Sequence, residues 1–150
     1  RYLHGGIYLP SLIGESVGHL AIGIDTSGSI GGHELNEFLT EVQAIADEVH
    51  PSHVDVLYWD SRVAGHEEYD QYSFKNITQS TKPAGGGGTD PRCVSAYLKE
   101  KNLKPEAVIM LTDGYVPDWG NDWEAPVLWT IVRNKNATAS VGKTIHIKDR

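Results

Sequence analysis

Three short, mostly apolar segments place the strongest constraint on how this chain of 150 residues can fold. They span residues 17–25, 107–113 and 127–132, and they show little of the alternation between polar and apolar residues that marks a half-exposed strand. Strands of this kind are typical of a parallel sheet that is buried on both faces. Segments with helical periodicity lie between the first two of them, and a long loop joins the second to the third, so the sequence predicts an α/β domain with a doubly wound, mostly parallel sheet.

Two helices are expected between these strands. Apolar residues recur at every third or fourth position over 32–49, which gives one apolar face, and Pro51 then ends the helix. The segment 91–103 predicts the second helix, with Asp90 near its N-cap and Pro91 at its first position. Because the helices follow different strands of a doubly wound sheet, we expect helices on both of its faces.

The remaining strands and the domain boundary come from shorter patterns. The segment 54–60 predicts a strand, and 63–69 predicts an antiparallel edge strand that follows a tight turn. A short last strand is expected at 144–147. Residues 1–16 are rich in glycine and in aromatic or aliphatic residues, so we interpret them as a lead-in from a preceding region. Residues 17–150 then form one domain, which is long enough for a hydrophobic core.

Composition excludes several classes of function. The net charge is −7 and no cluster of Lys and Arg offsets it, which argues against a nucleic-acid-binding face. No apolar run approaches the ~18 residues that are needed to span a bilayer. The single cysteine, Cys93, excludes an intrachain disulfide and fits a reducing compartment. We therefore expect a cytoplasmic protein that binds neither nucleic acid nor a membrane.

Oxygen-bearing side chains gather where the predicted strands end. Asp25, Ser27 and Ser29 alternate directly after the first strand, and Asp113 ends a later one. Thr89 follows a run of four glycines and precedes the second helix. Ligands of doubly wound sheets bind at the carboxyl ends of strands, where all these residues are expected. A set of hard oxygen donors suits a small hard cation such as Mg²⁺.

The order Asp-x-Ser-x-Ser, a distant Thr and a distant Asp resembles the metal-ion-dependent adhesion site (MIDAS) of von Willebrand factor A (VWA) domains, which have a Rossmann-like fold. The resemblance covers most of the chain. It implies that Ser27, Ser29 and Thr89 bind the cation directly, while Asp25 and Asp113 act largely through water. It further implies an open coordination position for an acidic residue of a partner protein, with Mg²⁺ as the cation and Mn²⁺ or Ca²⁺ able to replace it.

A narrower resemblance concerns the segments 6–11, 126–129 and 142–147. They are similar to a bacterial and phage subgroup in which a VWA-like domain forms the C-terminal half of a predicted metallopeptidase-like protein. Such proteins are often encoded beside MoxR-type AAA+ ATPases. This resemblance implies a MoxR-type ATPase, or a substrate delivered to it, as the partner. It also implies that any peptidase activity lies in an N-terminal part outside this chain, which opens at Arg1 and is expected to be a fragment or a processed product.

Two alternatives to a binding module remain at this point. A metal-dependent hydrolase could use Asp25 and Asp113 around Mg²⁺, but it needs a general base, and no His or Glu adjoins the motifs closely. Alternatively, Ser27 and Ser29 only cap a helix, and Asp113 only begins a turn. We expect the binding module rather than an enzyme, because helix capping does not require Thr89 as well.

Asp60, two histidines and two tryptophans lie outside the predicted ligand set. Asp60 ends the second strand, but we do not expect it to touch the site. His50 and His53 flank a helix end and could bind a metal, but we interpret them as solvent-exposed turn residues. Trp119 and Trp123 follow Asp113, and the sequence leaves open whether they cover the sheet or anchor a partner.

Overall fold

The computed structural model describes residues 18–74 and 87–147. The proposed lead-in, residues 1–16, and the first two glycines of the run at 85–88 lie outside these ranges. In chain order the elements are β1 (His19–Asp25), α2 (Gly32–Val49), β2 (His53–Trp59), β3 (Val63–Asp70), α4 (Arg92–Glu100), β4 (Ala107–Thr112), β5 (Val127–Val132) and β6 (Lys143–Ile147).

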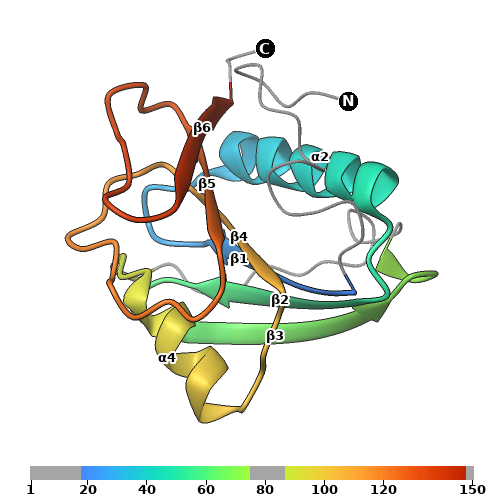
Figure 1. Ribbon diagram of the computed structural model, residues 1–150. Helices are drawn as coiled ribbons and strands as arrows, with labels where there is room; N and C mark the ends of the chain where they lie inside the picture. The colour runs from blue at the N-terminus through green and yellow to red at the C-terminus, as the bar shows by residue number, and fades with distance from the viewer. Residues whose placement is uncertain (1–17, 75–86, 148–150) are drawn as a thin grey trace.

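The six strands form one sheet in the order β3-β2-β1-β4-β5-β6 (Figure 1). Every neighbouring pair is parallel except β2 and β3, which are antiparallel. The predicted fold class, a mostly parallel sheet with one antiparallel edge strand, is therefore confirmed. The chain builds the sheet outward from β1 in one direction and outward from β4 in the other. The crevice between the carboxyl ends of β1 and β4 is thus the switch point at which such sheets bind ligands.

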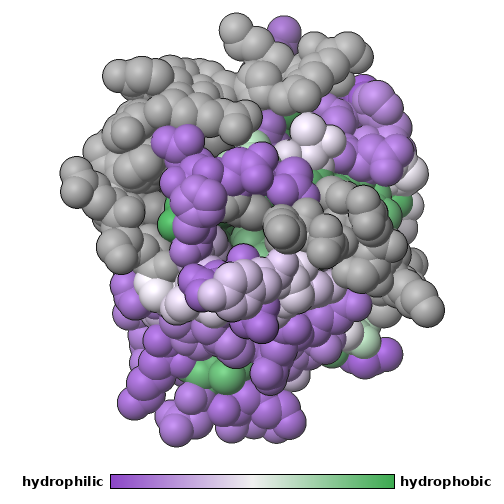
Figure 2. Space-filling model, turned by 90° about the vertical axis from the view of Figure 1, so that its right-hand side faces the viewer, coloured by the Kyte–Doolittle hydropathy of each residue, from purple (hydrophilic) through white to green (hydrophobic). Residues whose placement is uncertain are grey.

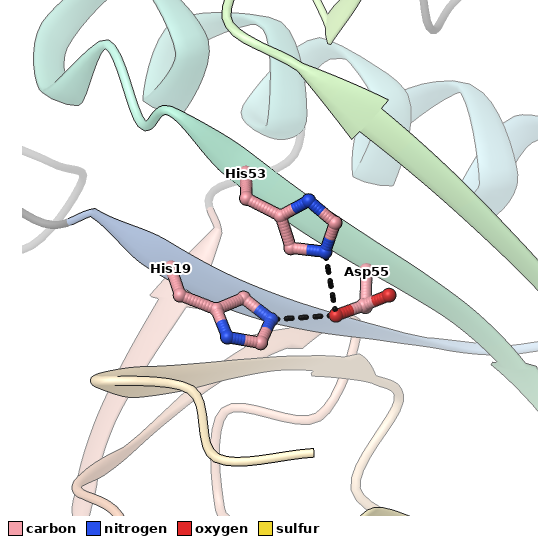
Figure 3. Close-up of side chains that lie close together, drawn as sticks. All are labelled: His19, His53 and Asp55. Atoms are coloured by element: carbon pink, nitrogen blue, oxygen red, sulfur yellow. Dashed lines mark hydrogen bonds and ion pairs between the residues drawn. The ribbon is translucent and has the colours of Figure 1, made fainter. Parts of the chain in front are cut away.

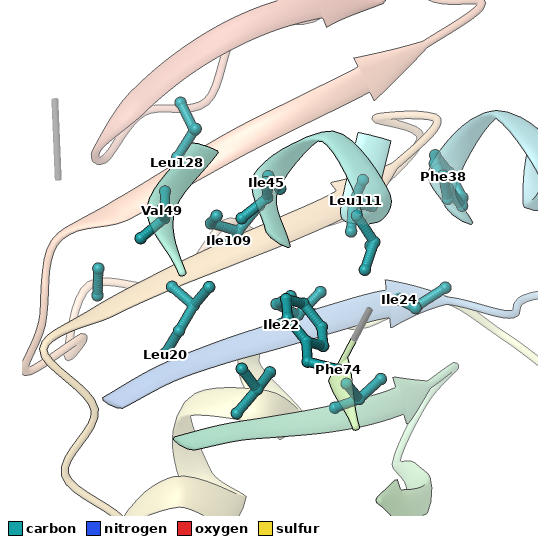
Figure 4. Close-up of a cluster of buried hydrophobic side chains, with 14 of the residues drawn as sticks. Leu20, Ile22, Ile24, Phe38, Ile45, Val49, Phe74, Ile109, Leu111 and Leu128 are labelled. Atoms are coloured by element: carbon teal, nitrogen blue, oxygen red, sulfur yellow. The ribbon is translucent and has the colours of Figure 1, made fainter. Parts of the chain in front are cut away.

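Helices cover both faces of the sheet, as predicted. In Figure 1, α2 lies on one side of the strands and α4 on the other. Alternate residues of each strand point to opposite faces, so the strands divide their side chains between two cores. The core beneath α2 (Figure 4) includes Phe38, Val42 and Ile45 of the helix and Leu20, Ile22 and Ile24 of β1. The core beneath α4 includes Val94 and Leu98 of the helix with Ala21, Leu57, Met110 and Trp129.

The start of α4 differs from the prediction. Pro91 occupies the N-cap with helical dihedral angles (φ −65°, ψ −18°), so the helix begins one residue later than expected. Asp90 lies near the N-cap as predicted, and its carboxylate accepts the Arg92 backbone N–H at 3.1 Å, the kind of bond that a capping side chain makes. Two guanidinium N–H groups of Arg92 add charge-assisted bonds to Asp90 at 2.9 Å.

The end of α4 also differs, since the helix stops at Glu100 rather than at residue 103. Asn102 has a φ of 55°, in the left-handed region, and its backbone cannot continue a right-handed helix. The other observed elements match their predicted ranges to within about two residues, which is the usual uncertainty of element ends.

The surface agrees with the acidic, polar composition. On the face shown in Figure 2, hydrophilic residues cover most of the described surface, and hydrophobic residues form only small areas. Within residues 18–74 and 87–147, no helix combines the length and the apolar character that crossing a membrane requires.

Gly142, just before β6, tests how tightly the outer strands are fixed. Its φ is +73°, and a Cβ at this position would lie against the Val127 carbonyl of β5. We expect Gly142→Ala to lower the free energy of unfolding by about 1–3 kcal/mol, because the backbone is strained for any L-residue and the carbonyl cannot move aside. Chemical denaturation followed by far-UV circular dichroism measures this change.

Gly32, at the start of α2, provides the matched control because no atom lies within 4 Å of an added Cβ there. Gly32→Ala should change the unfolding free energy by no more than about 1 kcal/mol, and in the stabilising direction. Equal stabilities for the two variants would contradict this description of the β5–β6 connection.

Candidate metal centre

The site predicted from the sequence lies at the carboxyl ends of the two central strands. Ile24 of β1 pairs with Leu111 of β4, so the residues that follow them lie at the same end of the two strands. Asp25 is the last residue of β1, and Asp113 directly follows β4. In Figure 1 the loops that follow β1 and β4 leave the sheet at the same end of the strands.

Asp25 is fully buried at the base of this site. Its Oδ1 accepts the backbone N–H of Ser27 at 2.8 Å, and its Oδ2 accepts the hydroxyl of Thr112 at 2.6 Å. Both carboxylate oxygens therefore have a protein donor, which fixes the turn between β1 and the following loop. The remaining lone pairs of these oxygens are available to a water or a cation.

Ser27, Ser29 and Asp113 form a row of oxygens above Asp25. The Ser29 hydroxyl donates to Asp113 Oδ2 at 2.7 Å, and the Ser27 and Ser29 Oγ atoms are 3.3 Å apart. Adjacent ligands of an octahedral Mg²⁺ ion are separated by about 3.0 Å, since each lies about 2.1 Å from the metal. Because Ser29 gives its proton to Asp113, its oxygen lone pairs remain available. Ser29 is exposed, whereas Ser27 and Asp113 are buried, so the row meets solvent at its Ser29 end.

Thr89 reaches the same corner on a separate loop. The Gly28 N–H, between the two serines, donates to the Gly87 carbonyl at 3.1 Å. Asp60 holds this loop from below: its Oδ2 accepts the Gly87 N–H at 3.1 Å, and its carbonyl accepts the Asp90 N–H at 2.8 Å. The structure thus links Asp25, Ser27, Ser29 and Asp113 through hydrogen bonds of their side chains, and a backbone bond joins this group to Gly87, two residues before Thr89.

The electrostatics of the site favour a cation. Burial raises the pKa of Asp25 above its ordinary value of 3.8, and the negative charge of Asp113 adds to this effect. Hydrogen bonds from Ser27 and Thr112 act in the opposite direction without cancelling the shift. Because burial and a nearby negative charge disfavour the ionised form of Asp25, a positive charge beside it would stabilise that form.

Sequence reasoning missed two residues of this site. Thr112 places a hydroxyl at the end of the otherwise apolar strand β4, and this pattern could have indicated a polar partner for Asp25. Asp60 does not bond to the side chains of the predicted ligands. Instead it positions the Thr89 loop, a role that depends on loop contacts no local pattern encodes.

The two tryptophans after Asp113 cover the sheet. The rings of Trp119 and Trp123 pack edge-on against Trp129 of β5, with centroids 4.9 and 5.7 Å away. The Trp123 indole N–H donates to the Trp119 carbonyl at 2.9 Å. Of the two alternatives that the sequence left open, the structure favours the covering role. Tyr115, by contrast, is 66% exposed beside Asp113.

Two other residues matter for the chemistry available here. Burial raises the pKa of the Cys93 thiol to about 12, so it stays protonated at neutral pH and is a poor nucleophile. His53 does not lie in an isolated surface turn, as we had interpreted it. It begins β2 and, with His19 and His66, contacts the buried carboxylate of Asp55.

Comparisons with known proteins agree with this architecture. An uncharacterized protein of Thermotoga maritima is 30% identical over 115 residues, which are 77% of this chain but only 26% of that protein. The chain thus spans about a quarter of this relative's length. The crystal structure of an aerotolerance-related membrane protein from Bacteroides fragilis, carrying multiple mutations to serine, superimposes with a TM-score of 0.54. The match covers 76% of this chain and 67% of that one at 12% identity, so this likeness shows the fold alone.

The family described as "VWA-like domain (DUF2201)" matches residues 20–148, from β1 to just beyond β6. This match spans every described strand and helix except the first residue of β1, and it includes all five residues of the candidate metal site. The chain belongs to this family of VWA-like domains.

Proposed function

We propose that this domain is a divalent-cation-dependent protein–protein interaction module. The observation that carries the proposal is the row of Ser27, Ser29 and Asp113, exposed at its Ser29 end, in which Ser29 donates its proton to the Asp113 carboxylate and keeps its lone pairs free. Such a row at the switch point of a VWA-like sheet can hold a cation and still leave one side of it accessible.

The donor set fits Mg²⁺ better than a softer metal. All five proposed ligands, Asp25, Ser27, Ser29, Thr89 and Asp113, are oxygen donors, and none is a thiolate or an imidazole. When bound, the cation supplies a Lewis-acidic position for an external carboxylate. Few charged ligands surround it, so the ion retains enough charge to attract an acidic side chain. Mn²⁺ or Ca²⁺ would occupy the same oxygens.

The partner is a protein with an exposed acidic residue. Tyr115 follows the site, and its N–H donates to Asp113 Oδ1 at 3.2 Å, which couples an exposed aromatic ring to a proposed metal ligand. Aromatic residues of this kind are enriched among interface anchors. The family resemblance noted in the sequence suggests a MoxR-type AAA+ ATPase, or its substrate, as the partner, with this chain acting as an adaptor.

The alternative, a metal-dependent hydrolase, has weaker support. Its general base would have to be Asp25 or Asp113, but both oxygens of Asp25 already accept hydrogen bonds at the buried base of the site. Among the described residues, His19, His53 and His66 contact Asp55, and His66 also contacts Tyr97 of α4, so these three imidazoles are engaged away from the rim. We propose that the domain is not itself an enzyme; assays with generic phosphate esters, comparing the wild type with Asp25→Asn, test this.

The first prediction concerns the cation. Isothermal calorimetry of the EDTA-stripped domain should detect one site for Mg²⁺ and for Mn²⁺. Ser27→Ala and Asp113→Ala should each weaken binding by at least about tenfold, which corresponds to about 1.4 kcal/mol, because each removes an oxygen from the row.

Ser140→Ala and Asp118→Ala are the matched controls, since both residues are exposed and lie outside the proposed ligand set. They should bind as the wild type does. A wild-type domain without measurable Mg²⁺ or Mn²⁺ binding would remove the main support for the proposed function.

The second prediction concerns the open coordination position. In NMR spectra of the Mg²⁺-loaded domain, added acetate should shift the backbone amide signals of Gly28, Gly114 and Tyr115. These shifts should disappear in EDTA, because the carboxylate binds through the metal. The affinity should be weak, about millimolar, which corresponds to about 4 kcal/mol.

Acetamide has the shape of acetate without its charge, so it should cause no shift. Equal shifts with acetate and acetamide, or with and without Mg²⁺, would argue against a metal-held carboxylate.

The third prediction concerns the stability of the metal-free domain. Asp25 has a raised pKa in the folded state and an ordinary value of 3.8 when unfolded, so the folded state binds this proton more tightly. Stability is therefore lost as the pH rises through the folded pKa. In EDTA at pH 7, Asp25→Asn should have a higher Tm than the wild type, because the amide keeps an acceptor for the Ser27 N–H and carries no charge.

This difference should shrink as the pH falls below the raised folded-state pKa of Asp25, where the wild-type carboxyl is also protonated. Thermal unfolding at a series of pH values measures it, with the exposed Asp118→Asn as control. A variant that is less stable than the wild type in EDTA at pH 7 would contradict the proposed role of the buried charge.

A further inference from the structure

A second group of side chains that can bind a metal lies at the amino ends of the strands, opposite the carboxyl ends where the predicted MIDAS lies. His19 begins β1 and His53 begins β2, and the parallel register pairs these two residues directly. Asp55 follows His53 by two positions, so both side chains point to the face that α4 covers. In Figure 3 the two imidazole rings converge on the carboxylate of Asp55.

The possible ligand atoms of this group lie about as close together as the ligands of a metal ion, or closer. The Nε2 atoms of His19 and His53 lie 2.5 and 3.2 Å from the same oxygen, Asp55 Oδ2. The three ligand atoms all lie within 4.8 Å of one another. Adjacent ligands of a tetrahedral Zn²⁺ ion are about 3.4 Å apart, given bond lengths of about 2.0–2.2 Å. Small rotations of the two imidazoles would therefore open the group enough to admit the ion.

The buried carboxylate has reason to bind a cation. Asp55 is fully buried within β2, and burial alone would raise its pKa. Hydrogen bonds from His66 and His19 outweigh burial and keep the pKa below its ordinary value, so the carboxyl is ionised at neutral pH. Its recorded ion-pair partners are all imidazoles, which, unlike Lys or Arg, carry no permanent charge. A divalent cation would supply that charge.

The other carboxylate oxygen is held in place by a chain of hydrogen bonds. His66 of β3 lies 2.7 Å from Asp55 Oδ1 through its Nε2, and its Nδ1 lies 2.8 Å from the Tyr97 hydroxyl of α4. Metal-binding carboxylates are commonly oriented by an outer shell of this kind. The side chains of His19 and His53 are 24% and 42% exposed, so an ion can enter from solvent.

We propose that His19, His53 and Asp55 form a second metal site, one that takes a transition-metal ion such as Zn²⁺. Two imidazoles and one carboxylate are ligands that suit Zn²⁺ and not Mg²⁺, which distinguishes this site from the oxygen-only rim. Three protein ligands leave the fourth tetrahedral position to water or to a group from outside the chain. His66 acts as a positioning residue through Asp55.

Zinc binding to the EDTA-stripped domain tests the proposal. Isothermal calorimetry with Zn²⁺, in the presence of excess Mg²⁺, should detect one site, and Co²⁺ should give the visible absorption of a tetrahedral complex. His53→Asn should weaken Zn²⁺ binding by at least about 100-fold, because one of three ligands is lost. His66→Gln should weaken it by about 10–100-fold, the usual effect of removing an outer-shell partner.

His33→Asn is the matched control, since His33 lies on α2, is 57% exposed and contacts Glu37. It should bind Zn²⁺ as the wild type does, and so should Ser27→Ala, which separates this site from the predicted MIDAS. His53 is exposed enough that its replacement should not prevent folding, and far-UV circular dichroism checks this.

Two results would overturn the proposal. In the first, the wild type binds Zn²⁺ no more tightly than His53→Asn does. In the second, binding survives His53→Asn but is abolished by His66→Gln, which would move the metal to the neighbouring group of Asp55, His66 and Glu68.

Discussion

The parallel pairing of β1 with β4 is the contact on which the rest of the domain depends. These two strands lie at the centre of the sheet, and the chain extends from β1 toward one edge and from β4 toward the other. Their residues are almost all buried, because α2 and α4 cover the two faces. The pairing also brings the ends of both strands together, so Thr112 donates to Asp25 although 87 positions separate them, and Asp113 directly follows Thr112.

The same register places different kinds of side chain at the carboxyl ends and at the amino ends of the strands. At the carboxyl ends, loops provide hydroxyls and carboxylates, and the oxygens are close enough to surround a small hard cation. At the amino ends, the pairing of β1 with β2 sets His19 against His53, and the antiparallel edge strand adds His66. A rigid, buried sheet keeps these two groups apart and holds each one in a fixed geometry, which a loop alone would not do.

The sequence allowed much of the fold to be predicted, because long apolar strands and an amphipathic helix are strong local signals. The strand at 127–132 and the helix at 32–49 were predicted with the bounds that the structure shows. Helix α4 was less well predicted at its end, because Asn102 adopts a left-handed conformation and the helix stops at Glu100. The local pattern of apolar residues carries no information about where the backbone takes this conformation.

The two candidate sites differ in how much of them could be inferred. The residues of the rim were named in advance because their spacing resembles that of a known family, yet the role of Asp60 in holding the Thr89 loop was not foreseen. Of the imidazole group, only His53 was considered as a metal ligand, and it was interpreted as a turn residue instead. His19 and His53 lie 34 positions apart, and only the register of β1 against β2 makes them neighbours. The one available signal was Asp55, a carboxylate at a core-facing position of an apolar strand.

Asp25 and Asp55 show why such carboxylates are informative. Each is fully buried in the sheet, where an ionised group is unfavourable unless partners compensate its charge. Around Asp25 the protein provides only neutral donors, and the pKa stays raised; around Asp55 three imidazoles lower it. Replacing a buried ionic group by apolar residues is often neutral or stabilising. The two cation sites proposed above would offset the cost of each buried charge, with oxygen donors around Asp25 and imidazoles around Asp55.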